Sequence, residues 1–326
     1  MKIGNIDFED SPLFLAPMED VTDPSFRYMC KQFGADMVYT EFVSADGLIR
    51  DARKSLEKLK ISDYERPVGI QIYGHLVEPM VEAAKIAEQS NPDVIDINFG
   101  CPVKKIATRG AGSGMMKEPD KMVEMTRRIV DAVKTPVTVK TRLGWDENSL
   151  IICELAERLQ DAGIAALTIH GRTRNQLYKG EADWNLIGEV KKNKRIRIPV
   201  IGNGDVNSPE IAKERFDTYG IDAIMIGRAT YGRPWIFRDI KYYLKYGKLL
   251  PEPDVDERVK IAKMHFIKSV EVKGEKVGVL EMRRHLSSYF KGLPDFKETR
   301  LKLVTENNPE EVLKLLDYTG KRWGNG

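Results

Sequence analysis

The feature that most constrains the fold of this chain is a repeated alternation of short, β-branched runs with longer amphipathic stretches. Eight such runs occur in the first 230 residues: Leu13–Pro17, Met37–Glu41, Val68–Tyr73, Val94–Phe99, Val137–Arg142, Leu167–His170, Val200–Asn203 and Ala223–Ile226. The stretches between them carry apolar residues at helical spacing, as in Met80–Gln89, Asp120–Val133 and Leu150–Ala162. Gly34, Gly163 and Gly220 stand where a helix ends before the next run. Eight strands alternating with helices predict an α/β fold, the (β/α)8 TIM barrel.

A doubly wound open sheet is the alternative, because it uses the same alternation of strand and helix. That fold favours a GxGxxG turn after its first strand, and Ala16–Asp20 contains none. The barrel is therefore the preferred prediction.

The alternation stops after Arg228, where Pro234 and Trp235 end the last loop. A proline-bearing linker, Leu249–Asp254, precedes three predicted helices: Glu257–Val270, Lys276–Phe290 and Pro309–Tyr318. We expect a barrel domain over residues 1–240 and a small all-helical domain over residues 241–326, frayed from Gly320 to Gly326.

Charge and apolar content narrow the class of protein. The chain contains no apolar run near the roughly 18 residues of a membrane span. Its first residues include Asp7, Glu9 and Asp10, unlike a signal peptide, so a cytoplasmic protein is expected. Three cysteines are too few and too scattered for a disulfide framework or a zinc site, and we expect no metal.

The basic residues concentrate toward the C-terminus. From residue 241 to residue 326 there are 18 Lys and Arg against 13 Asp and Glu, in a chain whose total net charge is +3. The remainder is thus mildly acidic, with a net charge of −2. This asymmetry indicates either a polyanionic partner or a solvated Lys/Glu-rich surface, and charge alone does not choose between them.

Polar residues gather at the predicted carboxyl ends of the strands, where TIM barrels carry their chemistry. Glycine-bearing turns after strands seven and eight, Gly202–Asp205 and Gly227–Arg228, predict a phosphate site. Lys140 is a candidate for stabilising developing negative charge, and Gln71 offers an amide donor and acceptor.

Cys101 follows Gly100 and precedes Pro102 in a loop at this rim. Its thiol is a candidate nucleophile or proton donor, and a structural role stays open. Cys30 and Cys153 fall within helical patterns and are expected to be small packing residues.

Six motifs in this order resemble the tRNA-dihydrouridine synthases, and the spacing and helical tail resemble the bacterial B-type branch most. They are Ala16–Met18 with Thr22–Asp23, Asn98–Pro102, Lys140–Arg142, His170–Thr173, Gly202–Asp205, and Gly227–Arg228 with Pro234–Trp235. The resemblance extends from about residue 10 to about residue 305.

The resemblance implies an FMN-dependent oxidoreductase that reduces the C5–C6 double bond of a uridine in tRNA with electrons from NADPH. Hydride passes from flavin N5 to C6, and Cys101 matches the cysteine that gives a proton to C5. The residues that match flavin contacts are Ala16, Pro17, Met18, Gln71, Lys140, His170, Asn203, Gly204, Asp205, Gly227 and Arg228. The expected substrate contacts are Asn98, Arg172 and Arg174 at the rim, with Arg283 and Arg284 in the basic tail.

One departure from the family pattern and two other functions stay open. Ser288 stands where the family usually has tryptophan, within the tail segment Arg283–Gly292. A flavin oxidoreductase acting on a free pyrimidine would not need a basic helical tail. A non-catalytic RNA-binding barrel would bind no flavin.

Overall fold

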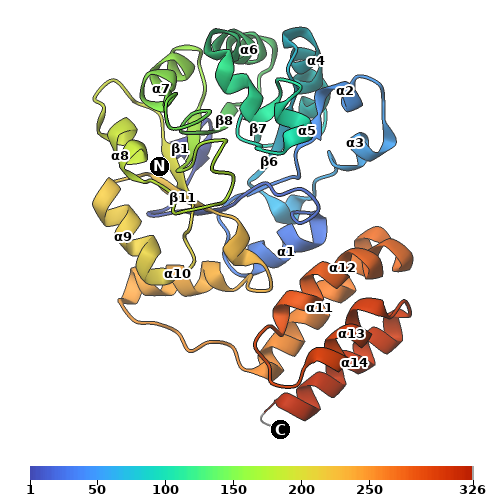
Figure 1. Ribbon diagram of the computed structural model, residues 1–326. Helices are drawn as coiled ribbons and strands as arrows, with labels where there is room; N and C mark the ends of the chain where they lie inside the picture. The colour runs from blue at the N-terminus through green and yellow to red at the C-terminus, as the bar shows by residue number, and fades with distance from the viewer. Residues whose placement is uncertain (325–326) are drawn as a thin grey trace.

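The computed structural model describes residues 1–324, and its centre is a closed barrel of eight parallel strands (Figure 1). The strands are β3 Leu13–Leu15, β4 Val38–Tyr39, β6 Val68–Tyr73, β7 Val94–Asn98, β8 Val137–Arg142, β9 Ala166–His170, β10 Val200–Asn203 and β11 Ala223–Ile226. Their order is β3-β11-β10-β9-β8-β7-β6-β4. A parallel bridge between Phe14 and Met37 joins the two ends of this order, and Leu15 N donates to Met37 O at 2.9 Å. This closure confirms the TIM barrel and excludes the open sheet.

Helices surround the barrel, as the alternation predicts. They are α1 Pro24–Gln32, α2 Ala45–Leu48, α3 Arg53–Glu57, α4 Val77–Glu88, α6 Pro119–Ala132, α7 Ile152–Asp161, α8 Asn185–Lys192, α9 Pro209–Tyr219 and α10 Ile236–Tyr246. Asp23 and Ser208 cap α1 and α9 by accepting backbone N–H bonds. Gly220 ends α9 with a φ of +61°, the left-handed conformation that glycine adopts without strain.

Several short elements lie outside the predicted pattern. A hairpin of β1 (Lys2–Ile3) and β2 (Ile6–Asp7) precedes the barrel, and β5 (Val43–Ser44) pairs with β6. The short helix α5 (Lys104–Ala107) and the 3-10 helix η2 (Gly112–Lys117) follow β7. Two further 3-10 helices are η1 (Asp63–Glu65) and η3 (Arg228–Thr230). These pieces have too few residues to produce a periodic signal.

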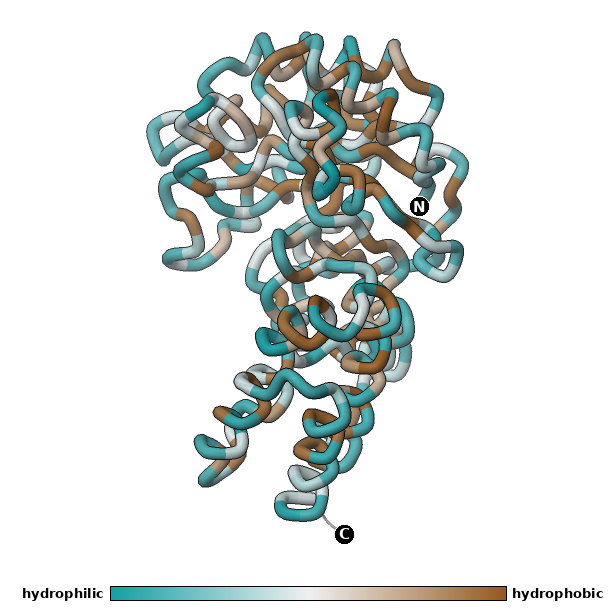
Figure 2. Tube along the Cα trace, turned by 90° about the vertical axis from the view of Figure 1, so that its right-hand side faces the viewer, coloured by the Kyte–Doolittle hydropathy of each residue, from teal (hydrophilic) through white to brown (hydrophobic). Residues whose placement is uncertain are grey.

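A bundle of four helices projects from one side of the barrel (Figures 1 and 2). It contains α11 (Val255–Lys273), α12 (Glu275–Tyr289), α13 (Lys297–Thr305) and α14 (Pro309–Trp323). Helix α13 was not predicted, because only Thr299 and Leu303 of its nine residues are buried. The expected fraying is wrong for residues 320–323, which complete α14, and residues 325 and 326 lie outside the described part. No helix among the described residues is long and apolar enough to cross a membrane.

The contact between bundle and barrel combines an ion pair with stacked rings. Lys273 Nζ at the end of α11 lies 2.5 Å from Asp23 Oδ2, and both side chains are almost fully buried. His285 stacks on Phe26 of α1 with ring centroids 4.7 Å apart. Ser288 lies against Gly232, because a Cβ built on that glycine would be 2.5 Å from the Ser288 carbonyl carbon. The bundle is therefore fixed beside the loop that follows β11, close to the carboxyl ends of the barrel strands.

Candidate active site

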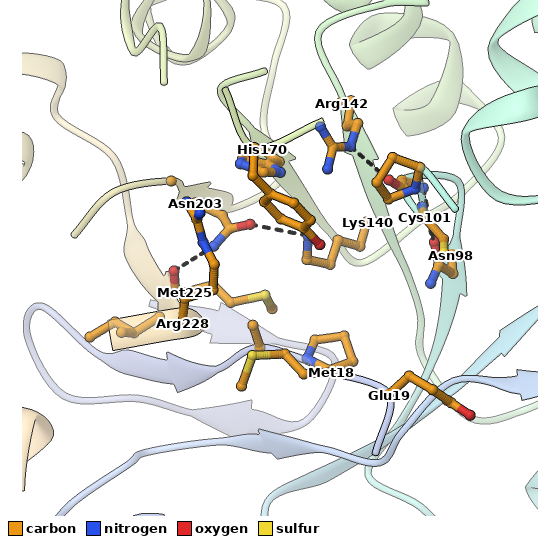
Figure 3. A pocket seen from close by; sticks show the side chains of 18 of the residues that line it. Met18, Glu19, Asn98, Cys101, Lys140, Arg142, His170, Asn203, Met225 and Arg228 are labelled. Carbon is orange, nitrogen blue, oxygen red and sulfur yellow. Dashed lines mark hydrogen bonds between the residues drawn. The ribbon is translucent and has the colours of Figure 1, made fainter. Parts of the chain in front are cut away.

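A cavity of about 610 Å³ opens at the carboxyl ends of the strands (Figure 3). This volume is typical of a site for a cofactor or small molecule. Of the residues predicted from the sequence, the cavity is lined by Ala16, Pro17, Met18, Gln71, Asn98, Cys101, Lys140, His170, Asn203, Gly204, Asp205, Gly227 and Arg228. The closed barrel brings these residues to one rim from seven separate segments of the chain.

One side of the cavity is apolar and held by the segment after β3. Ala16 N donates to Ile226 O at 2.8 Å, which ties this segment to β11. Met18 N donates to Thr22 Oγ1 at 3.0 Å, so the turn before α1 is fixed as well. Gly227 faces these residues, because a Cβ built there would lie 3.4 Å from Met18 sulfur. The result is an apolar surface suited to packing against a planar ring.

Lys140 faces this surface from β8. Its Nζ donates to Asn203 Oδ1 at 3.1 Å, and Asn203 Nδ2 donates to Met225 O at 2.8 Å (Figure 3). Burial, followed by repulsion from Arg142, lowers the pKa of Lys140 to about 8. No carboxylate of residues 1–324 forms a direct ion pair with this ammonium, so it presents a positive charge to the cavity.

A chain of directed hydrogen bonds fixes the loop that bears Cys101. Asp96 Oδ1 and Oδ2 accept from Thr138 Oγ1 and Gln71 Nε2, each at 2.6 Å. Gln71 Oε1 then accepts from Asn98 Nδ2 at 2.8 Å. Asn98 Oδ1 in turn accepts from the backbone N–H groups of Gly100 at 2.9 Å and of Cys101 at 2.8 Å.

Asp96 is fully buried, and desolvation raises its pKa to about 6 despite these hydrogen bonds. The Gln71 amide, predicted as a ring contact, is therefore already bonded at both ends. One of its Nε2 hydrogens is left for a ligand.

Cys101 lies at the cavity wall with a nearly buried side chain. Burial raises the pKa of its thiol above the usual value, which keeps the thiol protonated at neutral pH. Arg142 donates from Nε to Gly100 O at 2.7 Å and acts to lower the pKa of Cys101. A protonated thiol with a fixed cation beside it is suited to giving a proton and stabilising the resulting thiolate.

The turns after β10 and β11, where the sequence predicts a phosphate site, both line the cavity. Asp205 accepts from Arg172 Nη2 at 2.6 Å and from Arg228 Nη2 at 3.0 Å. Burial acts to raise the pKa of Asp205, but the bonds from Arg172 and the Ala182 N–H outweigh it and lower the pKa. Gly204 has a φ of +134°, which favours glycine. Asp205 thus holds the Arg228 guanidinium at the cavity edge.

His170 also faces the cavity, and it is held neutral. Burial and then the nearby cations Arg142 and Lys140 lower its pKa well below the usual range. Its Nε2 lies 3.4 Å from Arg172 Nη1, so the imidazole contacts the same guanidinium that binds Asp205. A neutral imidazole at this rim can accept or donate a hydrogen bond without adding charge.

Four predicted substrate residues lie outside the cavity. Arg172 is buried behind the wall against Asp205, and Arg174 lies over Trp145 at 4.6 Å. Arg283 donates to Thr305 O at 3.0 Å and to Asn307 Oδ1 at 2.9 Å, which ties α12 to the end of α13. Arg284 faces the barrel, with Nη2 3.6 Å from Asp20 Oδ2.

Sequence reasoning missed several residues of the cavity wall. They are Glu19, Phe42, Arg142, Tyr178 and Tyr231. Arg142 had a usable signal, because residues two apart on a strand share a face and Lys140 was already a candidate. The others lie in irregular loops, where the sequence carries no periodic signal.

Fold and site together define a TIM-barrel protein with a protonated thiol, a buried lysine and two glycine-bearing turns with an arginine around one cavity. The model of the dihydrouridine synthase (Dus) family matches residues 14–322. The chain belongs to this family. The prediction made from the motifs is thereby confirmed.

Relatives of similar length support this assignment. A probable tRNA-dihydrouridine synthase of Rickettsia prowazekii is 40% identical over 313 residues, covering 96% of this chain and 95% of the relative. The tRNA-dihydrouridine synthase B of Pseudomonas putida is 41% identical over 304 residues, covering 92% of this chain and 88% of the relative.

Two solved structures resemble the chain in fold. A complex of 2-naphthoyl-CoA reductase has a TM-score of 0.58 at 13% identity, over 75% of this chain and 51% of that one. The chain thus spans about half the length of that reductase. Histamine dehydrogenase from Rhizobium sp. 4-9 has a TM-score of 0.52 at 13% identity, over 96% of this chain and 63% of that one. At this identity the likeness shows the fold alone.

Membership of the family implies a flavin cofactor, and the cavity fits one. Ala16–Met18 supply an apolar surface for the ring, and Lys140 supplies a cation for charge that a reduced ring carries. The turns at Gly204 and Gly227, with Arg228, would supply donors for its phosphate. Arg228 donates to Asp205 through Nη2, and its other guanidinium nitrogens make no hydrogen bond within residues 1–324.

Proposed function

We propose that this chain is a tRNA-dihydrouridine synthase that binds FMN, takes electrons from NADPH and reduces a uridine of tRNA. The observation that carries the proposal is the joint placement of Cys101, Lys140 and the Arg228 rim around one cavity, in a chain of the dihydrouridine synthase family. The names of the relatives from Rickettsia and Pseudomonas support tRNA as the substrate. One phosphate rim favours FMN over a dinucleotide flavin, because no second phosphate-binding turn of the GxGxxG type follows a strand.

Residues of the chain have separate roles in the proposed reaction. FMN, held by Ala16–Met18, Lys140 and the Arg228 rim, would supply the hydride for the uracil ring. Cys101 gives the proton to C5, and Arg142 and Lys140 stabilise the thiolate that this leaves. Asn98 holds the Cys101 loop in place and can also face the base. The target uridine must leave its stack to enter the cavity, because the C5–C6 bond is inaccessible within one.

We further propose that residues 1–240 act as the FMN-binding catalytic domain and residues 241–326 as the helical tRNA-binding domain, in a cytoplasmic enzyme. The basic balance of the tail and the position of Arg284 beside the barrel support a tRNA contact there. The alternatives, a free-pyrimidine reductase and a non-catalytic RNA-binding barrel, have no observation in their favour.

The test is direct detection of the product. Purified protein, FMN, NADPH and an unmodified tRNA transcript are incubated together, and digested tRNA is analysed by mass spectrometry for dihydrouridine. We expect dihydrouridine in tRNA and none when free uridine replaces tRNA. Protein that binds no flavin, or that reduces free uridine as well as tRNA, would contradict the proposal. Mapping the modification in tRNA from a deletion strain then identifies the position.

A further inference from the structure

A second hollow, which we call the Trp145 groove, lies at the same end of the barrel as the active site. It has a volume of about 470 Å³ and is lined by Lys104, Ala107, Thr108, Gly110, Gly114, Lys117, Glu118, Trp145 and Arg174. These residues come from α5, η2, the residues that follow each of them, and the loops that follow β8 and β9. None of these residues lines the cavity of the active site.

The groove shares a wall with the Cys101 loop. Ser113 Oγ and the Ser113 backbone N–H both donate to Cys101 O, at 2.8 and 3.1 Å. Gly114 packs directly on α5, because a Cβ built there would lie 2.3 Å from Ala107 O. Only the short segment that contains Ser113 and Gly114 therefore separates the groove from Cys101, the proposed proton donor.

Two cations are held against one aromatic ring in this groove. Lys117 Nζ lies 3.9 Å from the centroid of the Trp145 ring, and Arg174 Cζ lies 4.6 Å from it. The backbone supports this arrangement, since Arg174 N donates to Gly144 O and Asn175 N donates to Trp145 O, each at 3.0 Å. The indole thus fixes both positive groups, whose side chains would otherwise be disordered in water.

The groove is lined by three cationic side chains, Lys104, Lys117 and Arg174, and by one carboxylate, Glu118. Within residues 1–324, no carboxylate forms an ion pair with Lys104, Lys117 or Arg174, and Glu118 is paired with Lys121 instead at 3.4 Å. Arg174 makes one side-chain bond, from Nη1 to Asn175 Oδ1 at 3.0 Å, and its Nε is buried without a partner. Fixed, unpaired cations in a concave site favour an anion.

We propose that the Trp145 groove binds a backbone phosphate of tRNA next to the uridine held in the active site. This inference rests on the proposed function. A phosphate fits better than a base, because the Trp145 ring that a base would stack on already carries two cations. An adjacent phosphate is suitable, since a nucleotide extruded past the Cys101 loop leaves its neighbouring backbone at the loop's outer side. The groove then fixes the register of the strand while the cavity holds the base.

The test compares the tRNA affinity of Lys117→Ala with that of wild type over a range of salt concentrations. Lys117 is exposed, so the variant is expected to fold and to retain its flavin. We expect tRNA affinity to fall roughly tenfold at low salt, the size of one charge-assisted hydrogen bond. The salt-dependence slope should fall by about one, because one fewer phosphate is neutralised. Lys192→Ala, on the outer helix α8, is the matched control and should keep wild-type affinity and slope.

A second variant tests whether the ring fixes the charges. Trp145→Leu keeps every cation, so we expect weaker tRNA binding with the wild-type salt slope. Wild-type affinity and slope in Lys117→Ala would overturn the proposal. A raised KM for NADPH with unchanged tRNA affinity would overturn it too, and would assign the groove to the phosphate of the dinucleotide. Wild-type protein that makes no dihydrouridine would instead refute the proposed function.

Discussion

Replacing Asp96 by asparagine is expected to stabilise the protein at neutral pH. The carboxyl group is fully buried, and desolvation raises its pKa from 3.8 to about 6. Because one pKa unit corresponds to about 1.4 kcal/mol, keeping Asp96 ionised costs about 3 kcal/mol of folding free energy at pH 7. Asparagine has the same shape, accepts from Gln71 Nε2 and donates to Thr138 Oγ1, whose hydroxyl can turn to accept.

The sign of the pH dependence follows from the raised pKa. The penalty develops as pH rises from the unfolded value of 3.8 toward about 6, and is constant above that. The advantage of Asp96→Asn over wild type should therefore be about 3 kcal/mol at pH 7 and about half as large at pH 5. The pKa of about 6 already includes the attraction of the Lys140 ammonium, so its loss in the variant needs no separate correction.

Urea denaturation of both proteins without added FMN, at pH 5, 6 and 7, measures this difference. A variant that is less stable than wild type at pH 7, or an advantage that does not grow between pH 5 and pH 7, would refute the reasoning. Thr126→Ser is a control, because Thr126 is buried and bonded to Met122 O in helix α6 with no titratable partner. Its effect on stability should not vary over this pH range.

Four further variants probe the cavity rim and the helical bundle. Arg228→Ala should lower the FMN content of purified protein, measured by absorbance after release, and a wild-type content would contradict the phosphate role. The rate of flavin reduction by NADPH should fall as pH rises through about 8, where Lys140 loses its proton, and Lys140→Gln should be slow and lack this limb. Arg284→Glu should weaken tRNA binding and reduce its salt dependence, whereas Arg283→Glu should mainly lower the melting temperature, because Arg283 bonds the α13–α14 connection. Equal effects of the two reversals on tRNA affinity would show that this division is wrong.

The sequence was sufficient for the barrel because eight short buried runs alternate with amphipathic helical stretches. The positions of Cys101 and Lys140 at the rim followed from that fold, since the carboxyl ends of parallel strands meet at one face. Pairings across the barrel were not predictable. The bonds from Arg172 to Asp205 and from Gln71 to Asp96 join strands through tertiary contact alone. Such contacts decide whether a predicted side chain lines the cavity or lies buried behind its wall. The motif that contains the residue does not decide this.

The helical bundle was less predictable from the sequence than the barrel. Helix α13 has almost no apolar period, and it forms because it packs between neighbouring helices and not because of its own pattern. The buried contact of Lys273 with Asp23 spans 250 positions of the chain, and nothing in the local sequence of either residue indicates it. Such contacts decide where a predicted domain lies relative to the site.

The central claim is that Cys101 gives the proton that completes uridine reduction, and single-turnover kinetics test it most directly. Enzyme with reduced FMN is mixed with excess tRNA, and flavin oxidation is followed by absorbance while dihydrouridine is measured in the quenched RNA. In Cys101→Ala we expect normal FMN content and normal reduction by NADPH, with oxidation by tRNA slowed by about 10²–10⁴-fold. Cys30→Ala and Cys153→Ala should oxidise at the wild-type rate, since one is buried in the core and the other lies on an outer helix. A wild-type rate of flavin oxidation and dihydrouridine formation in Cys101→Ala would contradict the account.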